Sequence, residues 1–253
     1  MGGIPLQPGI IYGPVFSRRL GRSLGINLLS IHQKLCSYDC IYCQYGPAKV
    51  WDASDGIDLF PSVETVLSAV EKALNKPRTI EYLTFSGNGE PTLHPDFAQI
   101  VQAVYELRNR YRPDAKIALL SNAFRVVEPQ LLSVFRCIDA PMMKLDAGDE
   151  QTFSAINRPG IGIDYHDLVE GLKRVPNLII QSLLIEGEIS NVRGAAYDAW
   201  SHTLAEVQPS EIHIYTVERP PATNFVFPVE PKKLEKIALD LIQRFNLNVQ
   251  AFW

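Results

Sequence analysis

What the chain lacks narrows the classes of protein that it can be. Only four cysteines occur in 253 residues, and three of them lie within eight positions, so a disulfide framework is excluded. No positively charged segment leads into an apolar run near the first residue, and no secretory signal is predicted. Sparse, unpaired cysteine is typical of a reducing compartment. We therefore expect a cytoplasmic protein.

Long hydrophobic runs and an excess of basic charge are also missing. Apolar stretches are interrupted well before the roughly 20 residues that span a bilayer, so no membrane role is predicted. The formal net charge is -4, which argues against a dedicated nucleic-acid binder. No repeat, low-complexity segment or composition shift interrupts the chain. With 46% hydrophobic residues, it is long enough for one large α/β domain with a buried core.

What is present is a regular alternation of strand-like apolar runs with amphipathic helical stretches, the pattern of parallel βαβ units. Six such units predict an α/β fold: a partial (β/α)6 barrel with an open side, because a closed barrel needs eight. Strands are expected at 25–29, 81–87, 116–123, 141–147, 178–187 and 211–218. Helices are expected at 61–75, 95–107, 129–135, 150–156, 164–174, 196–207 and 231–245, with a short strand after the last.

This pattern divides the chain into three segments. Residues 1–24 form an arginine- and glycine-rich N-terminal segment, 25–218 the partial barrel, and 219–253 a helix and strand extension packed on the barrel. In parallel α/β folds, ligands bind beyond the carboxyl ends of the strands. The cysteine loop, GNGEPT, SNA, KLDAG and TVERPP each follow a predicted strand. The polar and glycine-rich motifs are therefore expected on one face.

Cys36, Cys40 and Cys43 are spaced four and three residues apart in one loop. Soft thiolates select iron-sulfur clusters, zinc or copper(I). A structural zinc site is closed by four ligands, and His32 or His94 could supply the fourth, so a non-catalytic zinc-binding module is one alternative. Three thiolates on a [4Fe-4S] cubane would instead leave one iron free for an external ligand.

The spacing CxxxCxxC, with Tyr42 directly before the last cysteine, resembles the signature of the radical S-adenosylmethionine (radical SAM) superfamily. The resemblance extends over roughly residues 25–218. It implies a [4Fe-4S] cluster on the three cysteines, with S-adenosylmethionine bound to the open iron through its amine and carboxylate. It implies reductive cleavage to a 5′-deoxyadenosyl radical that abstracts hydrogen from a substrate. An oxygen-sensitive oxidoreductase type of enzyme with a flavodoxin or ferredoxin type electron donor follows from the same resemblance.

The resemblance also implies a cosubstrate site. Residues 87–91 are similar to the glycine-glycine-glutamate-proline motif that receives the methionine ammonium, although Asn88 separates the two glycines. An ordinary tight turn, satisfied loop polar groups and plain packing of the tyrosine are the structural alternatives. Ser182 is included, although neighbouring strand residues face opposite sides and Gln181 has an equal claim to the barrel wall. The cosubstrate residues so predicted are Tyr42, Gly87, Asn88, Gly89, Glu90, Ser121, Asn122, Lys144, Asp146 and Ser182.

The sequence says least about the substrate of the enzyme. Arg18, Arg19 and Arg219 are candidates for holding a substrate anion, while the first two could equally belong to a solvated flap. The combination of SRRLGRSLG, CSYDCIYC and ERPP resembles small stand-alone radical proteins grouped loosely with wyosine tRNA-modifying enzymes. The acidic net charge and the lack of further cysteine sets make tRNA modification a minor alternative. An activase that makes a radical on a partner enzyme is another, beside a small-molecule substrate.

Overall fold

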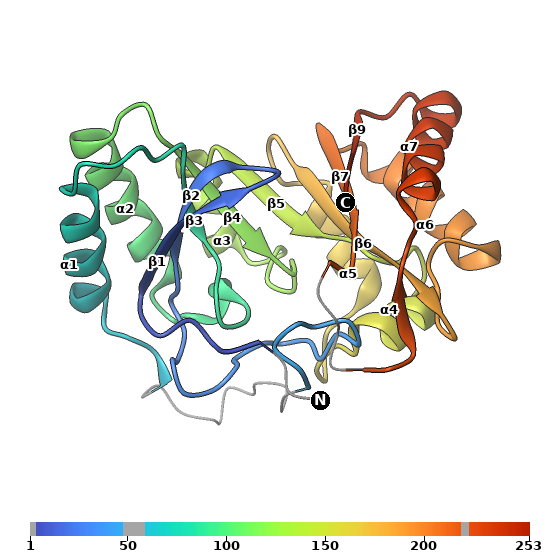
Figure 1. Cartoon of the computed structure of the whole chain (residues 1–253), viewed down its shortest axis with the longest axis horizontal. Coiled ribbons are helices and arrows are strands. Elements are labelled where there is room, and N and C mark those ends of the chain that lie inside the picture. The colour runs from blue at the N-terminus through green and yellow to red at the C-terminus, as the bar shows by residue number, and fades with distance from the viewer. Residues whose placement is uncertain (1–3, 48–58, 219–222) are drawn as a thin grey trace.

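The computed structural model describes residues 4–47, 59–218 and 223–253. Within them one sheet of nine strands runs in the order β1-β2-β3-β4-β5-β6-β7-β9, with β8 paired to β6. Figure 1 shows this sheet curling, with α1 and α2 outside one flank and α6 and α7 outside the other. The strands are β1 (Ile11–Ser17), β2 (Gly21–Ile26), β3 (Tyr82–Phe85), β4 (Lys116–Ser121), β5 (Ala140–Lys144), β6 (Ile179–Gly187), β7 (Glu211–Thr216), β8 (Val226–Pro228) and β9 (Val249–Phe252).

The strands from β2 to β7 pair in parallel, and β9 continues the sheet in parallel beside β7. The predicted α/β partial barrel is thereby confirmed. The predicted short C-terminal strand is a member of the same sheet rather than a separate addition. The helices are α1 (Val63–Leu74), α2 (Phe97–Tyr111), α3 (Pro129–Val134), α4 (Glu150–Asn157), α5 (Tyr165–Leu172), α6 (Gly194–Val207) and α7 (Pro231–Phe245), with short 3-10 turns at Pro91–Leu93 and Phe135–Cys137.

Local chemistry explains where the helices begin and which side they bury. The side chain of Ser62 caps α1 by accepting a hydrogen bond from the Thr65 amide, and Asp149 caps α4 in the same way. Val66 and Val70, one turn apart on α1, are fully buried against the sheet. Burying each such side chain contributes about 1.5–3 kcal/mol, so packing of the apolar stripe holds the helix. In the described part of the chain, no helix has the length and apolar character needed to cross a membrane.

The N-terminal part of the chain differs from the prediction. β1 and β2 form an antiparallel hairpin, and β2 begins at Gly21, four residues before the expected start at 25. The hairpin tip, residues 17–21, turns toward the concave side of the sheet: Leu20 is buried there against Ala118 and Met142. The three-segment division stays a prediction, but residues on both sides of its first boundary pair in one hairpin.

Candidate active site

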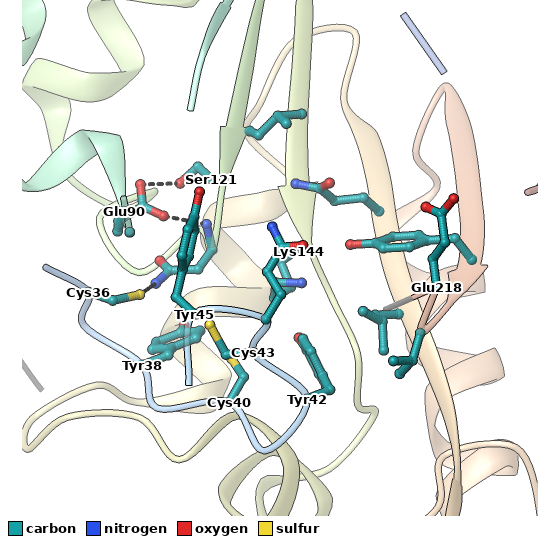
Figure 2. A pocket seen from close by; sticks show the side chains of 18 of the residues that line it. Cys36, Tyr38, Cys40, Tyr42, Cys43, Tyr45, Glu90, Ser121, Lys144 and Glu218 are labelled. Atoms are coloured by element: carbon teal, nitrogen blue, oxygen red, sulfur yellow. Dashed lines mark hydrogen bonds between the residues drawn. The ribbon is translucent and has the colours of Figure 1, made fainter. Parts of the chain in front are cut away.

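A cavity of about 630 Å³ lies on the concave side of the sheet, where the loops after β2, β3, β4, β5 and β7 converge. Figure 2 shows the three cysteines facing Glu90, Ser121 and Lys144 across it. The structure therefore brings most of the predicted site residues to one place. Those that line the cavity are Arg18, Arg19, Cys36, Cys40, Tyr42, Cys43, Gly87, Gly89, Glu90, Ser121, Asn122 and Lys144.

The cysteine loop is joined by its backbone to the loop after β3. Leu35 donates to the Asn88 carbonyl at 3.0 Å, and the Glu90 amide donates to the Leu35 carbonyl at 2.9 Å. Gly89 between them has φ +143°, and a Cβ there would lie 1.6 Å from the Leu35 carbonyl oxygen. Only glycine allows this approach. The pairing fixes the position of Cys36 relative to Glu90.

The far side of the same loop is attached to the end of α4. The Ile41 amide donates to the Ile156 carbonyl at 3.0 Å, and the Asp39 amide donates to the Arg158 carbonyl at 3.1 Å. The Cys43 amide closes a turn on the Cys40 carbonyl at 3.0 Å. The loop is thus held from both sides by elements distant in sequence.

The three cysteines of the loop are half-buried, and hydrogen-bond donors and positive charge lie beside their thiols. Burial raises the pKa of Cys36 to about 12 and raises that of Cys40, so both thiols hold their protons at neutral pH unless a cation replaces them. The Asn122 side-chain amide lies 3.7 Å from the Cys36 Sγ, and that of Asn157 lies 3.5 Å from the Cys40 Sγ. Burial lowers the pKa of Lys34, but the three thiols outweigh that effect and raise it.

This donor set fits a multi-iron cluster better than a single zinc ion. Within the described residues, no three His, Cys, Asp or Glu side chains form a group that could hold one metal ion. His94 cannot complete such a site as it stands, because its Nε2 bonds the Pro61 carbonyl at 2.8 Å and its Nδ1 accepts from the Asp96 amide at 3.1 Å. His32 is exposed. Three thiols on one loop, with amide donors near two of the sulfurs, match the usual surroundings of an iron-sulfur cluster.

Glu90 presents a buried carboxylate at the wall of the cavity. Its Oε1 accepts from Ser121 Oγ at 2.8 Å and from Thr92 Oγ1 at 2.7 Å, while its Oε2 accepts from the Asn122 amide at 2.6 Å. Burial raises its pKa, although these donors oppose that shift by favouring the ionised form. Oε2 carries one donor within the described residues and retains room for a second.

Asp146 requires a correction, because it does not line the cavity where a ribose or carboxylate could reach it. Its side chain is fully buried and accepts from the Tyr42 hydroxyl, from Asn157 Nδ2 at 2.7 Å and from the Leu183 amide at 2.8 Å. Its Oδ2 also lies 3.5 Å from the Lys144 Nζ. Asp146 therefore acts behind the cavity wall and holds the residues that face it.

Lys144 itself does reach the cavity, with its Nζ 5.1 Å from the centre of the Tyr42 ring. Burial lowers the pKa of Lys144, but Asp146, Tyr215 and Cys40 together outweigh that effect and keep the pKa above its usual range. The ammonium is therefore charged at neutral pH. Tyr42 and Lys144 form one wall of the site, beside the thiol of Cys40.

Two further predicted residues lie outside the cavity, and one lies outside the described part of the chain. The Asn88 side chain is turned to the protein, where it donates to the carbonyls of Gln7 at 3.0 Å and Ser30 at 2.9 Å. Ser182 is buried on the helix side and bonds Leu145 and Trp200. Its neighbour Gln181 lines the cavity instead. Arg219 lies outside the described residues.

The prediction missed Lys34, Asn157 and Tyr215. Lys34 stands two residues before the first cysteine, and that proximity alone could have indicated it. Asn157 ends α4 and reaches Cys40 across 117 positions of sequence, so no local pattern signals it. Tyr215 is one apolar position among several on β7, and only the curvature of the sheet turns it into the cavity.

Comparisons with known proteins agree with this fold. The model of the Radical SAM superfamily matches residues 30–188. A UPF0026 protein of Helicobacter pylori is 32% identical over 220 residues, which cover 85% of this chain and 68% of that protein. A solved structure of TYW1 with a lysine-pyruvate adduct bound has a TM-score of 0.59 at 14% identity, and covers 88% of this chain and 74% of its own.

A solved structure of native anSMEcpe with bound AdoMet has a TM-score of 0.62 at 16% identity, over 90% of this chain and 63% of its own. At such identities these structures show a shared fold, and the family match carries the assignment. The family implies S-adenosylmethionine and an iron-sulfur cluster, which the thiol triplet fits. The chain belongs to the radical SAM superfamily, as the cysteine motif predicts, and is an enzyme of that family.

Proposed function

We propose that this enzyme holds a [4Fe-4S] cluster on Cys36, Cys40 and Cys43 and binds S-adenosylmethionine and a substrate in the same cavity. The bound cluster would supply one electron that cleaves S-adenosylmethionine to methionine and a 5′-deoxyadenosyl radical, which takes a hydrogen atom from the substrate. The observation that carries the proposal is the convergence of three thiols and the Glu90 carboxylate on one cavity. An external flavodoxin or ferredoxin type protein is the proposed electron donor.

The protein side chains have distinct tasks in this proposal. Lys34 places a positive charge beside the three thiols, which favours their ionised, metal-binding form. The amides of Asn122 and Asn157 direct N–H groups at two of the sulfurs and so stabilise negative charge on them. These groups come from the loop after β4, from α4 and from the cysteine loop, so the fold sets the environment of the ligands before any metal binds.

Glu90 and Lys144 offer opposite charges on two walls of the cavity. A zwitterionic methionine moiety presents an ammonium and a carboxylate, and Glu90 Oε2 and the Lys144 Nζ are suited to receive one each. Tyr42, beside Lys144, offers a ring face for the adenine. The pairing of complementary charges orients the cosubstrate without using the thiols.

The test is reductive cleavage in the absence of any substrate. The chain is reconstituted anaerobically with iron and sulfide, dithionite and S-adenosylmethionine are added, and 5′-deoxyadenosine is measured. We expect about four iron and four sulfide per chain and formation of 5′-deoxyadenosine. Cys40→Ala should abolish both, while Cys137→Ala, which removes the buried cysteine outside the loop, should keep both. A fully loaded chain that makes no 5′-deoxyadenosine would refute the proposal.

A further inference from the structure

The cavity has a second polar region, which lies over β6 and β7 and is completed by the hairpin tip. Arg19, from the tip, reaches across the concave side and donates from NH1 to the Gln181 Oε1 at 2.9 Å. Its guanidinium carbon lies 4.6 Å from the centre of the Tyr215 ring. All three residues line the cavity. A side chain from one edge of the sheet is therefore held against two strands near the other edge.

Arg19 is held in place without a counter-charge. Within residues 4–47, 59–218 and 223–253, no carboxylate lies within ion-pair distance of its guanidinium, whereas the neighbouring Arg18 pairs with Glu218 at 2.8 Å. The Gln181 side chain is fixed in turn, because its Nε2 donates to the Met142 carbonyl at 3.0 Å. Its Oε1 therefore points toward Arg19. A guanidinium has five donors, and its one hydrogen bond to the part of the chain that the structure describes, to Gln181, leaves most of them unused. Such an arginine in a cavity is well suited to bind an anion with two parallel hydrogen bonds.

Arg19 lies apart from the charged side chains that surround the thiols and the proposed cosubstrate site. Lys34 and Lys144 are the cations that act on the thiols. Arg19 acts instead on His213, whose pKa is lowered chiefly by burial, with Glu211 opposing and Arg19 adding to the shift. His213 is 5% exposed, and among the described residues its buried Nδ1 has no hydrogen-bond partner. The positive charges around the cavity thus fall into two groups, one beside the cysteines and one over β7.

We propose that Arg19 anchors an anionic group, a carboxylate or a phosphate, of a small-molecule substrate. Tyr215 and Leu183 line the cavity beside it and give the adjoining apolar part of that molecule a surface to pack on. This inference rests on the proposed function, and it specifies the class of substrate that the enzyme takes. It also separates the three candidate arginines: Arg18 is already neutralised by Glu218 and Arg19 is the anchor, while Arg219 lies outside the described residues.

The experiment measures binding of two probe anions, inorganic phosphate and 4-fluorobenzoate, to the reconstituted chain, followed by line broadening in ³¹P and ¹⁹F NMR. We expect saturable binding of at least one probe, and the preferred probe distinguishes phosphate from carboxylate. Arg19→Gln should weaken it by about tenfold or more, because a charge-assisted bidentate contact is lost. Arg18→Gln, the same change on the adjacent arginine, should stay within about twofold, since an exposed ion pair contributes little. Arg19→Lys, which keeps the charge, should recover part of the affinity.

Three results would overturn the inference: no saturable binding of either probe to the wild-type chain, equal weakening by the two glutamine variants, or loss of S-adenosylmethionine affinity in Arg19→Gln with probe binding unchanged. The last result would place Arg19 in the cosubstrate site. Iron content of each variant shows whether the chain has folded and loaded. Failure of the proposed function is seen separately, as a loaded wild-type chain that makes no 5′-deoxyadenosine whatever its affinity for the probes.

Discussion

Removing the Asp146 side chain should destabilise the whole protein as well as the site. The carboxylate is fully buried, and it accepts from Tyr42, Asn157 and the Leu183 amide while it neutralises Lys144. Asp146→Ala leaves the Leu183 amide without its acceptor and the Lys144 ammonium, only 16% exposed, without its counter-charge. Removing one partner of a buried ion pair costs about 3–5 kcal/mol. The separate losses do not add fully, because Asn157 still reaches the Tyr42 oxygen at 3.2 Å.

A loss of about 3–5 kcal/mol is a large part of the total stability of a domain, which is about 5–15 kcal/mol. Urea unfolding of the metal-free chain measures it, independently of any activity. Glu170→Ala, which removes a carboxylate from an exposed pair with Lys173, is the control and should leave the urea midpoint unchanged. Asp146→Ala should also lower the iron bound after reconstitution, since Tyr42 lies in the cysteine loop. If Asp146→Ala and Glu170→Ala unfolded at the same urea concentration, Asp146 would not be the carboxylate that holds Tyr42 and Lys144 in place.

Three other changes test separate parts of the site. Asn157→Leu removes the amide that faces the Cys40 sulfur and should lower the reduction potential of the loaded cluster by on the order of 30–60 mV, measured by EPR redox titration; an unchanged potential would contradict a hydrogen bond to sulfur. Glu90→Gln removes the carboxylate charge and should weaken S-adenosylmethionine binding about ten- to a hundredfold in calorimetry, whereas equal affinity would remove Glu90 from the ammonium site. The pKa of His94 is lowered, chiefly by burial, so its neutral form stabilises the fold above the ordinary histidine pKa of about 6.5 and this contribution is lost as pH falls below it. Unfolding free energies measured between pH 7 and pH 5 should therefore fall less steeply in His94→Gln than in the wild type. Equal slopes of unfolding free energy against pH in the two proteins would contradict this role of His94.

Features encoded by nearby residues could be predicted from the sequence. The βα alternation is visible because each strand and helix carries its own apolar period, and the cysteine loop is visible because its ligands lie within eight residues. The glycines at 87 and 89 were informative for the same reason: a positive φ requires glycine at that position, whatever lies around it.

Features that depend on distant residues could not be predicted. The hairpin was missed because an arginine- and glycine-rich stretch shows no strand period, and Leu20 gains its apolar surroundings only from strands far along the chain. Gln181 faces the cavity and Ser182 faces the helices, and a period of two cannot tell which of two neighbouring strand residues lies on the concave face. Asp146 ends a predicted strand, but the contacts that place it behind the cavity wall, with Asn157 and the Leu183 amide, come from α4 and β6.

The backbone pairing of Leu35 with Asn88 and Glu90 has a consequence for how the site is loaded. Two main-chain hydrogen bonds and a glycine set the spacing of these loops, and the Asn88 side chain adds hydrogen bonds to the carbonyls of Gln7 and Ser30. The cysteine loop loses its conformational entropy when the chain folds, so a metal cluster binds to ligands that are already ordered. A substitution at Gly89 would break this pairing whatever side chain it introduced, because any Cβ there collides with the Leu35 carbonyl oxygen.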